Sequence, residues 1–157
     1  SVKIFPQEKS TAYRQLCMEQ TISFITLGVT NLPASRAFYR KLDWQESAGS
    51  KEDIAFFQVG TTGFALYQRE ALAEDAQISA EGSGFTRFTL AHNVSSQADV
   101  DATLAEAIAA GATLTRPGEK ASWGGYRGYF MDPEGFVWEV CYNPFFLLDD
   151  NGHLLLP

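Results

Sequence analysis

Few side chains in this sequence have the type and spacing of a reaction centre. The 157 residues include two histidines, His92 and His153, and two cysteines, Cys17 and Cys141. Histidine is a common metal ligand, and cysteines that form zinc sites or disulfide frameworks recur at close spacing. Neither a histidine cluster nor a cysteine pattern is present. We therefore expect a reducing, cytoplasmic setting, with Cys141 a buried and inert thiol.

Two oppositely charged residues, Arg87 and Glu139, are stronger candidates for chemistry. Both fall in strand-like segments, and alternation along these segments points the two side chains to the same inner surface. One interpretation is an ion pair within the chain. The other is a binding site in which the planar guanidinium of Arg87 holds an anionic group of a ligand. In an apolar cleft, Glu139 is also a candidate general base.

An aromatic loop lies near these charges in the predicted fold. Trp123 is followed by Gly124 and Gly125, which predicts a movable wall over a ligand. Alternatively, Trp123 plugs the mouth of the cleft or forms a subunit contact. The chain has 12 Phe, 6 Tyr and 3 Trp, and we assign most of them to the core.

The elements that position these residues form two similar units, of which the first begins near residue 21. It consists of a strand, a helix and three short strands, separated by turns rich in Gly and Ser. The expected strands are 22–29, 44–48, 54–59 and 64–67. Asn31 is expected to cap the helix, with Pro33 in its first turn and a buried stripe of Ala34, Phe38 and Leu42.

The same order recurs after a connector that contains a short helical segment, residues 70–75. The expected strands of the second unit are 85–92, 113–115, 125–131 and 136–141. Its helix is expected to begin after Ser96, to bury Val100, Leu104 and Ile108, and to stop at Gly111. Residues 132–135, Asp-Pro-Glu-Gly, have the composition of a β-turn that joins the last two strands.

This order predicts an α+β fold of two βαβββ modules, residues 21–68 and 85–142, whose curved sheets surround a cleft. One domain then spans residues 20–143. We interpret residues 1–19 as an extension or tag, and residues 144–157 as an apolar tail that docks on the domain or on a neighbour. Alternation places one set of side chains toward the helices, namely Ile25, Leu27, Val29, Phe64, Leu66, Phe88, Leu90, Phe136, Trp138 and Val140. The set expected on the cleft side comprises Phe24, Thr26, Ala65, Tyr67, Arg87, Thr89, Val137, Glu139 and Cys141.

Charge and composition restrict the partners of such a domain. The formal net charge is −7 and the sequence pI is about 4.7, so the field of the protein repels phosphate backbones and anionic lipid surfaces. Hydrophobic residues make up 45% of the chain, which is typical of a globular protein. We expect no nucleic-acid partner and no membrane partner.

Four segments together resemble the vicinal oxygen chelate superfamily, which includes glyoxalases, bleomycin-resistance proteins, fosfomycin-resistance transferases and extradiol dioxygenases. These segments are residues 25–32, 37–40, 124–130 and 131–140, and the last contains Asp-Pro-Glu-Gly-Phe-Val-Trp-Glu. The resemblance covers about residues 21–143 and implies the same paired-module fold.

Metal-dependent members of that superfamily hold a divalent ion with four inward-pointing side chains. The resemblance places these positions at Phe24, at Ala65 or Tyr67, at Arg87 and at Glu139. A phenyl ring donates no lone pair, and a guanidinium places a fixed positive charge where the cation would lie. We therefore predict no metal ligands and no cofactor, which argues against lactoylglutathione lyase activity.

These observations favour a homodimer that binds a small organic ligand in a metal-free aromatic cleft. Stacking on Phe24, Tyr67, Trp123 and Tyr129 would hold the ligand, with Arg87 as the charge anchor and Glu139 beside it. The alternative is a lyase or isomerase that uses Glu139 or a tyrosine as a proton shuttle, or whose metal site is misassigned. In a third reading side chains fill the cleft, and the protein serves only in assembly.

Overall fold

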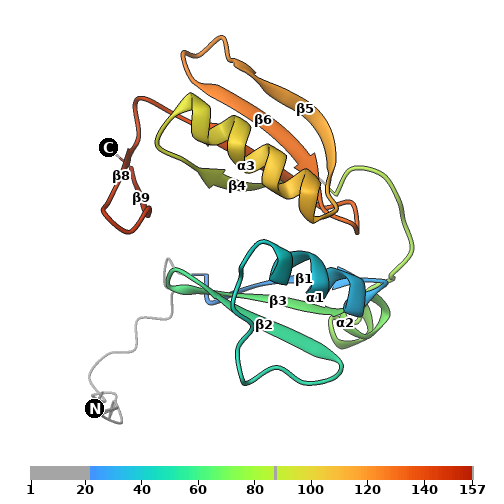
Figure 1. The fold of residues 1–157 in the computed structure, drawn as a ribbon. Helices are drawn as coiled ribbons and strands as arrows, with labels where there is room; N and C mark the ends of the chain where they lie inside the picture. The colour runs from blue at the N-terminus through green and yellow to red at the C-terminus, as the bar shows by residue number, and fades with distance from the viewer. Residues whose placement is uncertain (1–21, 87, 157) are drawn as a thin grey trace, which may run out of the picture.

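The structure is a computed structural model that describes residues 22–86 and 88–156. The predicted extension, residues 1–19, and the predicted anchor Arg87 lie outside this part of the chain. Three helices and nine strands occur in the described residues, and the strands form two curved sheets and one small hairpin (Figure 1). The α+β fold expected from the sequence is confirmed.

The first module consists of β1 (Phe24–Val29), α1 (Leu32–Lys41), β2 (Ile54–Val59), β3 (Thr62–Gln68) and the short helix α2 (Arg69–Asp75). Its sheet has the order β1-β3-β2, with β1 parallel to β3 and β2 antiparallel to β3. The strand expected at residues 44–48 does not form. Only an isolated bridge between Glu46 and Phe57 occurs there.

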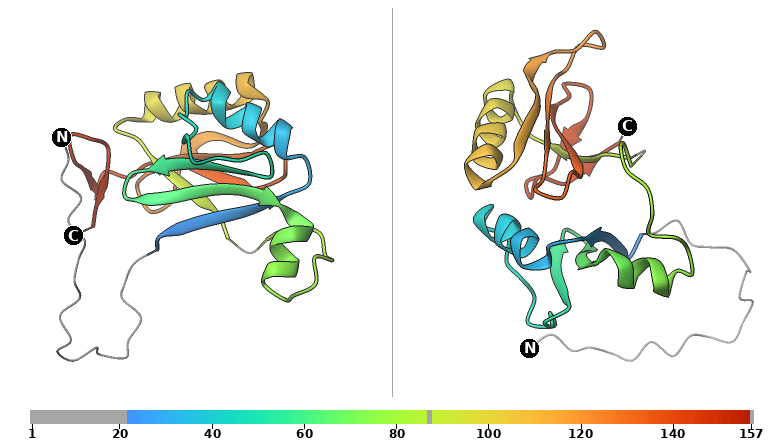
Figure 2. Two further views of the ribbon diagram at one scale, coloured as in Figure 1. Left: turned by 90° about the horizontal axis from the view of Figure 1, so that it is seen from below. Right: turned by 90° about the vertical axis from the view of Figure 1, so that its right-hand side faces the viewer.

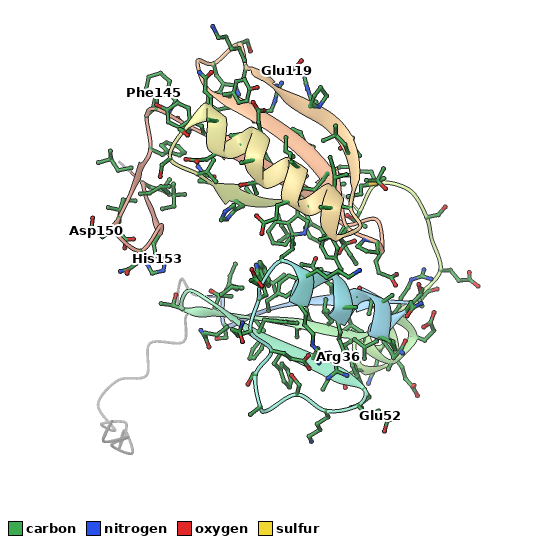
Figure 3. The ribbon with its side chains drawn as sticks, in the orientation of Figure 1. Arg36, Glu52, Glu119, Phe145, Asp150 and His153 are labelled. Carbon is green, nitrogen blue, oxygen red and sulfur yellow. The ribbon has the colours of Figure 1, made fainter. Side chains whose placement is uncertain are left out.

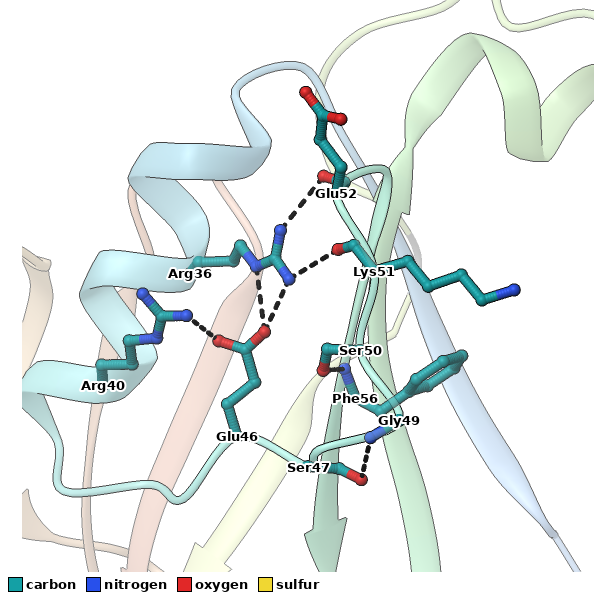
Figure 4. Close-up of polar contacts among 9 residues, drawn as sticks. All are labelled: Arg36, Arg40, Glu46, Ser47, Gly49, Ser50, Lys51, Glu52 and Phe56. Atoms are coloured by element: carbon teal, nitrogen blue, oxygen red, sulfur yellow. Dashed lines mark hydrogen bonds and ion pairs between the residues drawn. The ribbon is translucent and has the colours of Figure 1, made fainter.

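An ion-pair cluster joins this segment to α1. Arg36 donates to Glu46 Oε1 from Nε at 3.1 Å and from Nη2 at 2.6 Å, and Arg40 pairs with the other carboxylate oxygen (Figure 4). Arg36 also donates to the backbone carbonyls of Lys51 and Glu52. The cluster ties the Glu46 side chain to α1, while the backbone N–H of Ser47 donates to the carbonyl of Phe56 in β2 at 2.8 Å.

Helix α1 begins as predicted but buries a different face. The Asn31 side chain accepts a hydrogen bond from the Ala34 backbone N–H at 3.0 Å, which caps the first turn. Phe38 is buried as expected, whereas Ala34 is exposed. The buried residues of α1 are Leu32, Ser35, Phe38 and Tyr39, because the helix packs against both modules and not only against its own sheet.

The second module consists of β4 (Leu90–Asn93), α3 (Gln97–Ala110), β5 (Thr113–Lys120), β6 (Tyr126–Met131) and β7 (Val137–Tyr142), in the sheet order β4-β7-β6-β5. Residues 85–92 were expected to form its first strand, but β4 begins only at Leu90. Leu90 is the partner of Trp138, near the start of β7, so Phe88 and Thr89 have almost no strand beside them. Phe88 is accordingly 42% exposed and does not join the core.

Helix α3 confirms most of the local prediction. Ser96 Oγ accepts from the Asp99 backbone N–H at 3.1 Å, and Gly111 ends the helix with φ of 115°. Val100 and Leu104 are buried, but Ile108 is 44% exposed. Ala107 and Ala110 take its place on the buried face, where their small side chains allow the helix to approach the sheet.

The two modules meet through their helix sides. Helices α1 and α3 lie on one side of the two sheets, and α2 lies on the other (Figure 2). Aromatic contacts cross between the modules from Phe38 to Phe130, from Tyr39 to Trp138 and from Phe64 to Trp138. One hydrophobic core therefore runs through both halves.

The Asp-Pro-Glu-Gly turn fastens this junction. Glu134 accepts hydrogen bonds from Thr30 N at 3.0 Å, Thr30 Oγ1 at 2.8 Å and Asn31 N at 2.6 Å, at the start of α1. Tyr39 Oη donates to Asp132 Oδ2 at 2.8 Å and accepts from Trp138 Nε1 at 3.2 Å. The turn predicted from the sequence is confirmed, and its carboxylates hold the first module.

The C-terminal residues form a small hairpin of β8 (Leu147–Leu148) and β9 (Leu154–Leu155) beside the second module (Figure 1). Several of its apolar side chains are exposed, among them Phe145 at 66% and Leu147 at 69%. Much of the apolar surface of this tail has no cover within the described chain, so its docking on the domain or on a neighbour stays a prediction.

Candidate functional site

The side of each sheet that faces away from α1 and α3 carries most of the predicted site residues, and we call it the open face. On the second sheet, Arg127 and Tyr129 of β6 lie opposite Cys141 and Glu139 of β7. Gly128, between the two β6 residues, approaches Leu104 of α3. Because alternate residues of a strand point to opposite faces, Arg127, Tyr129, Glu139 and Cys141 share the open face.

A charged network holds Arg127 on this face. Arg127 Nη1 lies 3.3 Å from Glu119 Oε1, and Arg116 Nε donates to the same oxygen at 2.6 Å. The hydrogen bond and charge of Arg116 hold the pKa of Glu119 below its ordinary value. Figure 3 shows Glu119 near the tip of the β5–β6 hairpin. The side chain of Arg127 is only 13% exposed, against 48% for Arg116, so Arg127 is the more desolvated cation.

Glu139 affects the pKa values of two neighbouring side chains. Burial and then the charge of Glu139 raise the pKa of Tyr129, its cross-strand partner. Burial, followed by the same charge, raises the pKa of Cys141 to about 11. Both groups therefore carry their protons at neutral pH. The expectation that Cys141 is buried is confirmed, and a protonated thiol is a poor nucleophile.

The open face of the first sheet is aromatic at one end. Phe24 is 53% exposed, and its ring lies over Gly63, where no side chain intervenes. It also packs edge-to-face against Phe56, with ring centroids 5.6 Å apart. These residues border a hollow of about 230 Å³ that Ser47 and Gln58 also line. Phe24 thus lies where a ligand ring can stack.

Helix α2 covers the other end of this face. Gly28 lies opposite Tyr67, and a Cβ placed on Gly28 would lie 3.2 Å from the Arg69 backbone and 3.3 Å from Leu72. Tyr67 is half-buried in this region, and Ala65 is 1% exposed although alternation places it on the open face. Tyr67 is therefore the less accessible of the two aromatic residues predicted for this sheet.

The donor set at the predicted metal positions does not fit a divalent ion. Phe24 offers only its ring, Ala65 has no donor, and Tyr67 has only its phenol group, which lies beside α2. Glu139 is the single carboxylate of the set, and Arg87 lies outside the described residues. Within residues 22–86 and 88–156, no three His, Cys, Asp or Glu side chains are grouped to hold a metal ion.

Trp123 lies in the loop between β5 and β6 and is 45% exposed. Its ring lies against Gly125, where an added Cβ would come within 1.9 Å of it. Phe145, from the C-terminal segment, lies next to Gly124. The loop thus brings Trp123 to the end of β6, close to the tail, and its movement over a ligand stays a prediction.

The structure joins some of the predicted site residues and separates others. It places Tyr129 beside Glu139 through strand pairing, whereas Phe24 and Tyr67 occupy two ends of the other sheet. The aromatic contacts between the modules involve helix-side residues, so the two open faces point away from this junction. Sequence reasoning missed Arg127 and Phe56 as site residues. Arg127 lies two residues before Tyr129 on β6, and strand alternation would therefore have placed it on the same face.

Comparisons with known proteins agree with this architecture. Residues 21–140 match the Glyoxalase/Bleomycin resistance protein/Dioxygenase superfamily. A glyoxalase-related enzyme from Fulvimarina pelagi is 32% identical with a TM-score of 0.79, and the match covers 87% of this chain and 98% of that chain. A family enzyme from Burkholderia phytofirmans PsJN is 28% identical with a TM-score of 0.68, over 76% of this chain and 96% of that one.

The chain therefore belongs to the Glyoxalase/Bleomycin resistance protein/Dioxygenase superfamily, and the resemblance seen in the sequence is confirmed. Lactoylglutathione lyase from Agrobacterium tumefaciens shares the fold at 21% identity and a TM-score of 0.61, over 79% of this chain and 94% of that one. A search among proteins with curated functions returned no match. Among the described helices, none combines the length and the apolar character needed to span a membrane.

Proposed function

We propose that this protein binds a small organic ligand against the open faces of its sheets, without a metal ion. The observation that carries the proposal is the row of Arg127, Tyr129 and Glu139 on one open face, with the exposed ring of Phe24 on the other. Aromatic surface beside a few fixed polar groups is the usual make-up of a small-molecule site. The donor set at the family's metal positions supports a metal-free site.

The ligand class follows from the charges of this face. Arg127 presents a planar guanidinium that is largely shielded from solvent, and among the described residues its one carboxylate partner is Glu119. A second carboxylate, supplied by a ligand, would bind the same guanidinium with bidentate hydrogen bonds. We therefore propose an aromatic or unsaturated carboxylate as the ligand. Arg87, the anchor predicted from the sequence, stays a prediction.

The site is incomplete in one chain, and we propose that a second copy completes it. The modules of one chain meet through their helix sides, which leaves both open faces without a facing sheet, although α2 covers one end of the first. Exposed leucines of the C-terminal hairpin add apolar surface that association would bury. In a homodimer, the first sheet of one copy would face the second sheet of the other.

Binding of 2-naphthoate, followed by its fluorescence, tests this proposal, with sedimentation velocity measured on the same sample. We expect a dimer that binds 2-naphthoate and binds the neutral 2-naphthol about tenfold more weakly. R127A should abolish this preference, and F24A should weaken both probes. R116A is the matched control, because Arg116 contacts the same carboxylate but is far more exposed. Full affinity in both R127A and F24A would overturn the proposal.

Metal analysis adds a separate test. Protein purified without chelator and then treated with EDTA should bind 2-naphthoate with unchanged affinity. Stoichiometric zinc, nickel or iron in the untreated protein, together with loss of binding after EDTA, would contradict the metal-free site.

A second candidate function is an isomerase or lyase, favoured by the pairing of Glu139 with Tyr129. A carboxylate that accepts a proton next to a phenol that retains its own is an acid–base pair within reach of one ligand. If this pair acts in catalysis, E139Q should abolish turnover of a substrate while its binding remains. Binding that weakens in parallel with turnover would assign Glu139 to the binding site alone.

A further inference from the structure

A cavity of about 170 Å³ lies between the two modules on their helix sides, apart from the open faces. The end of α1 and the following segment supply Tyr39, Leu42 and Trp44, and α3 supplies Thr103, Glu106 and Ala107. An apolar cavity of roughly 150 Å³ accommodates a benzene ring. This space therefore suits a molecule of about one ring.

The inner walls of the cavity are aromatic. Trp44 and Trp138 meet edge-to-face, with centroids 5.9 Å apart and planes at 82°. Phe130 lies parallel to Trp138, with planes at 8° and centroids 6.1 Å apart. Faces of Trp and Tyr carry negative electrostatic potential and attract organic cations.

The outer part of the cavity carries a negative charge. Glu106 lies on an exposed position of α3, and within the described chain no Lys or Arg forms an ion pair with it. His92 lines the same cavity. Burial of its ring lowers the pKa of His92, although the charge of Glu106 acts in the opposite direction. Glu106 therefore gives the outer part of the cavity a negative charge that no Lys or Arg of the described residues balances.

We propose that this cavity is a second ligand site, which binds a small aromatic or alkyl amine in its cationic form. The hydrocarbon part packs against Trp44 and Trp138, and the ammonium group faces Glu106 and the imidazole of His92. This preference is opposite to that of the open face, where Arg127 selects an anion. The two sites therefore differ both in position and in ligand charge.

Three probes of similar size test the proposal on the full chain: benzylamine, benzyl alcohol and benzoate. Indole N–H signals in NMR spectra report their binding, since Trp44 and Trp138 both line the cavity. We expect benzylamine to bind about tenfold more tightly than benzyl alcohol and benzoate to leave these signals unshifted. E106Q should reduce the affinity for benzylamine to that of benzyl alcohol without changing the latter.

Two further variants test whether benzylamine binds in the cavity or elsewhere on the surface. E74Q removes an exposed carboxylate on α2 and should leave benzylamine affinity unchanged. A107L fills the cavity from α3 and should block benzylamine and benzyl alcohol alike. If A107L does not fold, the E106Q comparison still decides. Equal affinities for benzylamine and benzyl alcohol, no binding of benzylamine, or full affinity in E106Q would overturn the proposal.

Discussion

The two faces of β7 contrast the region that holds this protein together with the region that is free to bind. On the helix side, Trp138 and Val140 pack into a core shared by both modules. On the open side, Glu139 and Cys141 lie beside Tyr129 and Arg127. Adjacent residues of this strand thus lie in different environments, because their side chains point to opposite faces of the sheet.

Polar groups also differ between the two faces in their hydrogen-bond partners. At the junction, the hydroxyl of Tyr39 has both an acceptor, Asp132, and a donor, Trp138. On the open face, Glu139 influences Tyr129 and Cys141 mainly by its charge. A buried polar group without partners is costly, whereas one at an uncovered surface remains available to a ligand. The contrast explains why stability and binding should respond to different substitutions.

Substitutions of Trp138 and Glu139 are expected to give the largest difference in unfolding free energy. W138A removes a ring that contacts Tyr39, Trp44, Phe64 and Phe130, so we expect a loss of about 3 kcal/mol in unfolding free energy. E139Q, the neighbouring change, should alter it by less than about 0.5 kcal/mol. Urea unfolding measures both. Equal losses in the two variants would contradict the division of the strand into two faces.

Removal of the Tyr39 hydroxyl is expected to have an intermediate effect on the unfolding free energy. Burial, and then the charge of Asp132, raise the pKa of Tyr39, so its proton stays in the hydrogen bond to Asp132. Y39F should cost about 1–3 kcal/mol, because Asp132 and the Trp138 N–H lose a buried partner. A double-mutant cycle with D132N should show that the two changes are not additive. Additive losses would argue against a coupled network.

Substitution of Glu134 is expected to have the smallest effect on the unfolding free energy, and this effect should depend on pH. Burial disfavours its charge, but hydrogen bonds from Thr30 and Asn31 outweigh it and hold the pKa of Glu134 below 4.5, its ordinary value. Its stabilisation is therefore present above pH 4.5 and is lost as the pH falls through the lower folded-state value. We expect E134Q to lose about 1 kcal/mol at pH 7 and progressively less below pH 4.5. A loss that is constant from pH 7 to pH 3 would show that the carboxylate charge contributes nothing.

Local features of the fold could be predicted because they depend on neighbours in the sequence. Asn31 and Ser96 cap their helices with their own side chains, and Gly111 ends a helix because its φ is positive. Strand alternation correctly separated Trp138 from Glu139. The same reasoning failed at residues 44–48 and 88–89, because strand formation depends on a partner strand that the local pattern does not reveal.

The site was predicted only in part for a similar reason. Tyr129 and Glu139 lie together because they are paired in adjacent strands, and their shared face follows from the period of the sequence. The position of α2 near Tyr67, and the cavity that His92 and Trp44 share, arise from packing between distant segments.

By itself, the sequence determined the helix caps, the turns, the inward and outward directions of strand residues and the family. These depend on backbone geometry and on interactions over a few residues. Only the tertiary structure decided that the modules join through their helix sides, with Asp132 and Glu134 holding α1. That choice rests on the fit of aromatic surfaces more than 90 residues apart in the chain, for which no local rule exists.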